Sequence, residues 1–169
     1  MKLHRQIRRA FCALLVCAGM AQAEVQSFDV VVVGGTPGGI GASVAAARLG
    51  RSVALVEYYD HLGGMSASGL GKSDITVVDA IGGLWDEFVG RVLAHYAEKC
   101  GAESEQVKAC RGGYFYEPSV AEAVFNQMIA EHKGITVFVG HCLDEAVRTD
   151  RRVTAARIRS RKSGDAVEL

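Results

Sequence analysis

The chain has 169 residues, of which 49% are hydrophobic and 22% charged, with 19 basic and 19 acidic residues. This length and composition fit one globular domain. The charge balance conceals an asymmetry, because residues 1–23 contain four basic residues and no acidic one. The sequence has no basic stripe interleaved with aromatic residues, which excludes the usual nucleic-acid footprint, and we expect no nucleic-acid partner.

Residues 1–23 have the organisation of a bacterial signal peptide. A basic stretch precedes the apolar run Ala10–Met20, and Ala21-Gln22-Ala23 has the small-x-small form that signal peptidase accepts. We predict cleavage after Ala23, export to the periplasm or the medium, and no stable membrane anchor afterwards. The run is shorter than the roughly 20 apolar residues that span a bilayer. The pair Arg8-Arg9 is compatible with export by the twin-arginine pathway as well as by the general secretion pathway, and both alternatives stay open.

Residues 28–57 have the pattern of strand, tight turn, helix and strand. Phe28–Val33 is a continuous Val-rich run, typical of a strand buried on both faces. Gly38–Leu49 has small and apolar residues at helical spacing, and Gly50 suits the left-handed cap that ends a helix. Val53–Val56 is the second buried run. We therefore predict an α/β fold in which a Rossmann-like βαβ unit begins a parallel sheet.

The rest of the chain predicts further helices and strands. We expect a helix over Ala80–Cys100, an irregular polar segment over Ala102–Gly113, and a helix that opens at Glu117. The apolar run Ile135–Val139 predicts a third parallel strand. Residues 143–169 predict a β-hairpin near the C-terminus.

The segment that carries chemical information is the glycine-rich turn between the first strand and the first helix. Against the pattern G-x-G-x-x-G, Gly34 supplies the first glycine and Gly39 the third, while Thr36 stands at the second position. The first glycine permits the sharp turn, the second lets the backbone approach a pyrophosphate, and the third lets the helix pack closely on the strand. Gly35, Pro37 and Gly38 complete the turn, and the helix N-terminus then presents N–H groups to the phosphates.

A carboxylate follows the second strand. Glu57 lies at the end of Val53–Val56, where an acidic residue accepts hydrogen bonds from the ribose hydroxyls of a dinucleotide. The same charge repels a 2′-phosphate, which disfavours NADP. Turn, helix and terminal carboxylate together predict a site for the ADP half of a dinucleotide.

With these residues in view, the chain resembles the FAD-dependent oxidoreductase family of two-dinucleotide-binding-domain flavoproteins. The resemblance rests on four segments, residues 29–57, 61–74, 81–88 and 112–129. It implies FAD as the cofactor and hydride transfer from a small organic substrate to the flavin. It also implies that the loop beginning Gly63, Gly64, Met65 and Ser66 lies along the FAD pyrophosphate.

The resemblance further implies that residues 24–169 are the N-terminal part of an FAD-binding domain that is incomplete here. Family members continue through a substrate domain, so the catalytic residues, which are unknown, are expected beyond Leu169. Two alternatives stay open: a non-catalytic truncated remnant, and a domain of an NAD-binding enzyme that uses the same βαβ unit.

The remaining cysteines and histidines carry less information. In an oxidising compartment Cys100 and Cys110 would be able to form a disulfide between two helices, and unpaired thiols are the alternative. There is no CxxC motif and the histidines lack metal-ligand spacing, so we expect no metal site.

Overall fold

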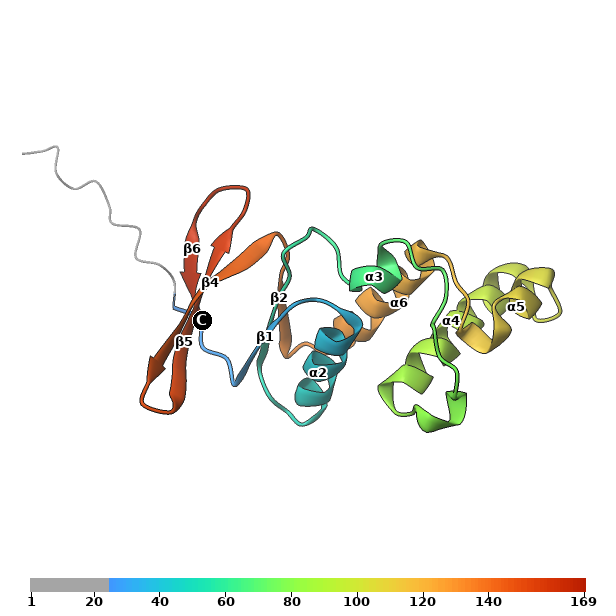
Figure 1. Cartoon of the computed structure of the whole chain (residues 1–169), viewed down its shortest axis with the longest axis horizontal. Coiled ribbons are helices and arrows are strands. Elements are labelled where there is room, and N and C mark those ends of the chain that lie inside the picture. The colour runs from blue at the N-terminus through green and yellow to red at the C-terminus, as the bar shows by residue number, and fades with distance from the viewer. Residues whose placement is uncertain (1–24) are drawn as a thin grey trace, which may run out of the picture.

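The computed structural model describes residues 25–169, so the expected signal peptide and its cleavage after Ala23 lie outside the described residues. Figure 1 shows a parallel sheet in the middle of the molecule, an antiparallel sheet on one side of it and most of the helices on the other. No helix within the described range is long and apolar enough to cross a bilayer.

The predicted βαβ unit is confirmed. Strand β1 (Val30–Val33), helix α2 (Pro37–Arg48) and strand β2 (Val53–Val56) follow one another, and β1 and β2 pair in parallel. Gly50 has a φ of 74°, the left-handed conformation expected of a residue that ends a helix. The valine-rich runs form strands because both faces of a parallel sheet are covered.

Strand β3 (Ile135–Phe138) pairs in parallel with β2, so the sheet order is β1-β2-β3 with β2 in the centre. All four residues of β2 are buried. Because the three strands are parallel, their carboxyl ends meet at one edge of the sheet. The turn after β1 and Glu57 after β2 are thus brought to the same edge.

Two long helices, α4 (Leu84–Cys100) and α6 (Pro118–Ala130), pack with α2 to form the larger core. At its centre the rings of Phe88 and Phe125 stack with centroids 4.4 Å apart. The helix expected over Ala80–Cys100 corresponds to α4, and its predicted start at Ala80 was wrong, because α4 begins at Leu84. Gly83, with a φ of 67°, precedes the first helical residue.

Shorter elements complete this half of the chain. They are α3 (Gly64–Ala67), η1 (Val78–Ala80), α5 (Glu105–Ala109) and η2 (Arg111–Gly113). The prediction of an irregular segment over 102–113 was wrong for α5 and η2. Helix α5 forms in a polar stretch because the Ser104 hydroxyl accepts a hydrogen bond from the Val107 N–H and caps its first turn.

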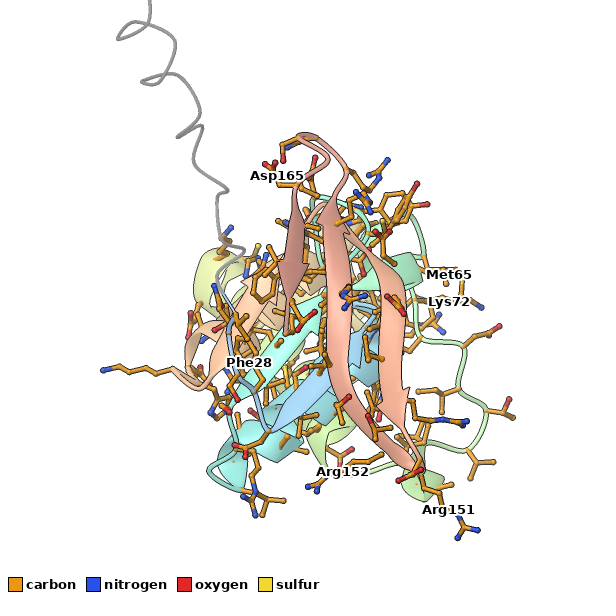
Figure 2. The ribbon with its side chains drawn as sticks, turned by 90° about the vertical axis from the view of Figure 1, so that its left-hand side faces the viewer. Phe28, Met65, Lys72, Arg151, Arg152 and Asp165 are labelled. Atoms are coloured by element: carbon orange, nitrogen blue, oxygen red, sulfur yellow. The ribbon has the colours of Figure 1, made fainter. Side chains whose placement is uncertain are left out.

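The predicted C-terminal hairpin consists of β4 (His141–Thr149) and β5 (Arg152–Ser160), which pair antiparallel. A third strand, β6 (Ala166–Glu168), which was not predicted, pairs with β5. It is too short to show the alternation that marks a strand. Figure 2 looks onto this sheet, which lies over the parallel sheet. A second hydrophobic core fills the interface between the two sheets, where Ile158 of β5 is fully buried in one cluster with Ala54 and Val56 of β2.

The suggested disulfide does not form, since Cys100 and Cys110 are both free thiols. Cys100 is exposed at the end of α4, whereas Cys110 is buried and its Sγ atom donates to the carbonyl oxygen of Val107 at 3.1 Å. The two thiols therefore have opposite environments.

Candidate functional site

The site begins at Gly34, directly after β1. Its φ is 106°, a backbone conformation that L-residues with side chains rarely adopt. Its N–H donates to the carbonyl oxygen of Val56 at 2.7 Å, which ties the end of β1 to the end of β2. The turn needs glycine here for its conformation, as predicted for the first glycine of the motif.

Gly39 has the role predicted for the third glycine, because the close packing of the helix on the turn leaves no space for a side chain at this position. A Cβ atom at this position would lie 1.9 Å from the carbonyl oxygen of Gly34, far inside van der Waals contact. Gly35 is also restricted, because a Cβ atom there would lie 2.5 Å from the Leu62 side chain. The close packing of helix α2 against the turn therefore depends on Gly39, whereas at Gly35 it is the Leu62 side chain that limits the space.

Thr36, at the position of the missing second glycine, is the N-cap of α2. Its Oγ1 atom accepts a hydrogen bond from the Gly39 N–H at 3.3 Å, and Pro37 follows at the first helical position. The hydroxyl thereby satisfies one of the backbone donors that a helix N-terminus leaves unpaired. Capping accounts for threonine here.

Helix α2 keeps other backbone donors available. Within residues 25–169, no acceptor is hydrogen-bonded to the N–H of Thr36 or of Gly38. A Cβ atom placed on Gly34 would meet nothing within 4 Å, and one on Gly38 would meet only Thr36 Oγ1 at 3.9 Å. This open turn at a helix N-terminus has the chemistry of an anion site.

Glu57 lies against the turn and is only 7% exposed. Its Oε2 atom accepts a hydrogen bond from the Gly35 N–H at 2.5 Å, and Oε1 accepts from the Tyr59 N–H at 2.8 Å. Each carboxylate oxygen has a further lone pair. The buried carboxylate is therefore held rigidly and retains acceptor capacity for hydroxyl donors.

The second glycine loop packs on the first. The Gly63 N–H donates to the Gly35 carbonyl oxygen at 2.7 Å, and a Cβ atom on Gly64 would lie 3.3 Å from the Thr36 side chain. Gly63 has a φ of 106°, and a Cβ atom there would lie 2.9 Å from the Phe125 ring. Of the other two expected site residues, Met65 is 74% exposed and Ser66 is half-buried.

Two residues beside Glu57 were not predicted. Arg161, which directly follows β5, places its guanidinium 3.9 Å from the centre of the Tyr58 ring and donates to the Tyr58 carbonyl oxygen at 3.0 Å. This contact joins the antiparallel sheet to the segment after β2. Sequence patterns carry no signal for it, because 103 residues separate the partners.

The chain belongs to the FAD dependent oxidoreductase family, whose model matches residues 29–168. FAD, the cofactor expected from the sequence, is the cofactor of this family. The class of protein predicted from the glycine turn, the strand-end carboxylate and the second glycine loop is therefore confirmed.

Solved structures share the fold at low sequence identity. THI4 of Thermovibrio ammonificans has a TM-score of 0.55 and 20% identity, with 98% of this chain and 60% of that chain covered. The glycerol-3-phosphate dehydrogenase of Bacillus halodurans complexed with FAD has a TM-score of 0.55 and 13% identity, covering 85% of this chain and 32% of that chain. The quinol fumarate reductase subunit FrdA of E. coli has a TM-score of 0.53 and 16% identity, covering 85% and 31%. The chain thus spans at most 60% of these three structures.

Proposed function

We propose that this chain is the FAD-binding portion of an exported oxidoreductase that transfers a hydride from a small organic substrate to the flavin. The observation that carries the proposal is the contact of the Gly34–Gly39 turn with Glu57 and with the second glycine loop. Family membership supports FAD over NAD as the ligand of this arrangement.

Each group at the sheet edge fits one part of the cofactor. The N–H groups of Thr36 and Gly38, with the helix dipole behind them, would hold the pyrophosphate. Glu57 would accept hydrogen bonds from the adenosine ribose. The loop of Gly63, Gly64, Met65 and Ser66 would follow the pyrophosphate on its other side. The open space in front of Gly34 and Gly38 supports this assignment.

When bound, FAD supplies a flavin ring that accepts a hydride and so oxidises the substrate by two electrons. The residues of this chain bind the ADP half and orient the cofactor from that end. The chain spans at most 60% of the three related structures described above. We propose none of its residues as the catalytic base.

Export is the second part of the proposal. It is supported by the sequence of residues 1–23, in which a basic segment, an apolar run and Ala21-Gln22-Ala23 occur in signal-peptide order. Cleavage after Ala23 would release the mature protein into the periplasm or the medium. Cell fractionation tests export, which is contradicted if the protein is found only in the cytoplasm. Mass spectrometry of the N-terminus of exported protein tests cleavage, which is contradicted by an intact Met1.

The binding experiment uses the full chain mixed with FAD, passed through gel filtration and examined by flavin absorbance. We expect FAD to stay with the protein, ADP to displace it, and FMN to displace it poorly, because FMN lacks the adenosine that Glu57 would recognise. Displacement by FMN but not by ADP would contradict the assignment of the βαβ unit. Retention of NAD and not FAD would favour the alternative of an NAD-binding enzyme.

A further inference from the structure

The hairpin of β4 and β5 ends in a cluster of arginines. We call residues 148–153 the hairpin tip, and their sequence is RTDRRV. All of them are exposed, and Thr149 pairs with Arg152 across a two-residue turn. Figure 2 shows Arg151 and Arg152 at the end of the hairpin that lies opposite Asp165. The hairpin tip therefore presents its guanidinium groups to solvent.

The arginines of the hairpin tip have no side-chain partner within residues 25–169, in contrast to every other arginine in that range. The arginines that form ion pairs are Arg48, Arg51, Arg91, Arg157 and Arg159. Those that lie over an aromatic ring are Arg111 and Arg161. Unpaired like charges this close in sequence repel one another, so an anionic partner would stabilise the hairpin tip.

The hairpin tip lies at the edge of the parallel sheet opposite to the candidate FAD site. Val153, at the start of β5, lines one groove with Asp29, which precedes β1. Arg161, directly after β5, contacts Tyr58 beyond the end of β2. Because β1 and β2 are parallel, the first contact lies at their amino ends and the second at their carboxyl ends. A surface that binds the hairpin tip therefore leaves Glu57 and the glycine turn accessible.

Apolar side chains beside the arginines indicate which kind of anionic surface fits. Val153 is 63% exposed, and Val25, which lines the same groove, is 71% exposed. Arg148 lies opposite Val153 in the register of the hairpin, so charge and apolar surface are adjacent. At a bilayer surface, basic groups meet the lipid phosphates while apolar side chains reach the boundary of the acyl chains. An acidic protein would satisfy the charge alone.

We propose that the hairpin tip binds the protein reversibly to a membrane surface that contains anionic phospholipids. The guanidinium groups would contact lipid phosphates, and Val153 would enter the interfacial layer. Each basic residue near such a surface strengthens binding about fivefold, so the three arginines together give roughly a hundredfold. The association is independent of FAD, because none of residues 148–153 belongs to the candidate cofactor site.

The experiment measures co-sedimentation of the protein with phosphatidylcholine vesicles, with and without phosphatidylglycerol. Protein that begins at Glu24 is used, because the basic and apolar segments of residues 1–23 would themselves bind anionic vesicles. Both hydrophobic cores lie within residues 25–169. We expect binding only when phosphatidylglycerol is present, and release of the protein in high salt.

Variants test the two components of the hairpin tip. The double variant Arg151→Gln and Arg152→Gln is expected to bind anionic vesicles about tenfold more weakly or worse. Val153→Ser is expected to weaken binding severalfold without changing its salt dependence. The matched control is the double variant Lys99→Gln and Lys108→Gln, which removes the same charge from exposed positions of α4 and α5. Figure 1 shows these helices on the other side of the molecule from the hairpin, and we expect the control to bind like the parent.

Circular dichroism verifies that each variant is folded. Equal binding to vesicles with and without phosphatidylglycerol would overturn the inference, as would equal binding by the parent and the double arginine variant. Absence of vesicle binding by the parent would also overturn it. If the parent instead binds immobilised polyglutamate, the partner of the hairpin tip is an acidic protein and not a membrane.

Discussion

The backbone N–H of Gly35 donates a 2.5 Å hydrogen bond to Oε2 of Glu57, across 22 residues of sequence. The bond joins the turn after β1 to the carboxylate after β2. Because Glu57 is 7% exposed, its carboxylate has little freedom to move relative to the turn. The position of the proposed ribose-binding carboxylate is therefore fixed to the glycine turn in the folded structure.

Replacing Glu57 with glutamine tests the ribose assignment. The amide keeps one acceptor for the Gly35 N–H but loses the negative charge and one acceptor oxygen, so we expect the Kd for FAD to rise about tenfold or more. Fluorescence titration of FAD measures the change. Glu98→Gln, at an exposed glutamate of α4, is the control and is expected to leave the Kd unchanged. An unaltered Kd in Glu57→Gln would refute the ribose role.

Gly39→Ala is expected to prevent formation of the turn, because the added Cβ would lie 1.9 Å from the Gly34 carbonyl oxygen. We expect loss of FAD binding and a fall of about 3 kcal/mol or more in the free energy of unfolding. Gly90→Ala in α4 is the matched control, since a Cβ there meets nothing within 4 Å. It is expected to stabilise the helix by about 0.5–1 kcal/mol. Urea unfolding followed by circular dichroism distinguishes the two.

Substitutions of Thr36, which stands at the second glycine position of the motif, test whether its hydroxyl caps helix α2. Thr36→Ala removes the acceptor for the Gly39 N–H, and we expect a loss of about 1 kcal/mol in the free energy of unfolding. Thr36→Ser retains the hydroxyl and is expected to unfold within about 0.5 kcal/mol of the parent. If alanine and serine variants unfold at the same urea concentration, the hydroxyl does not stabilise α2.

Arg91 joins α4 to α6 through bidentate contacts. Its Nη1 atom lies 2.6 Å from Oε1 of Glu131 and its Nη2 atom 2.7 Å from Oε1 of Glu87, which also pairs with Arg48 of α2 at 2.8 Å. We expect Arg91→Met to lower the free energy of unfolding by about 1 kcal/mol, since the network is only partly exposed. In 1 M salt the difference from the parent is expected to shrink. Arg148→Met, at an exposed arginine of β4, is expected to have no such effect.

The raised pKa of Tyr96 predicts how the free energy of unfolding changes at alkaline pH. Burial, and then the hydrogen bond to the Glu117 carboxylate, raise the pKa of Tyr96 from 10.0 to about 12. The neutral phenol is thus favoured in the folded state, so its contribution is complete below pH 10 and is lost as the pH rises towards 12. We expect the free energy of unfolding to fall more steeply over this interval in the parent than in Tyr96→Phe. A single group contributes at most about 1.4 kcal/mol per pH unit. Parallel curves for the two proteins would contradict the raised pKa.

Much of the fold could be predicted because the signals are local. Val-rich runs, a glycine turn and helical spacing are properties of neighbouring residues, and they located β1, α2 and β2 correctly. Weak local signals produced the errors. The polar residues of α5 carry no apolar stripe, and the three residues of β6 are too few to alternate. Both form because a cap or a neighbouring strand stabilises them.

The turn that we propose binds the cofactor was recognised from Gly34, Gly39 and Glu57, since each meets a requirement of backbone conformation, close packing or charge at a given spacing. Only the tertiary structure decided what these residues contact. Parallel pairing of β1 and β2 brings Gly35 to Glu57, and packing of the second loop brings Gly63 to Gly35. The same applies to the contact of the Arg161 guanidinium with the Tyr58 ring. Such contacts depend on the order of strands and the packing of helices, which no short stretch of sequence contains.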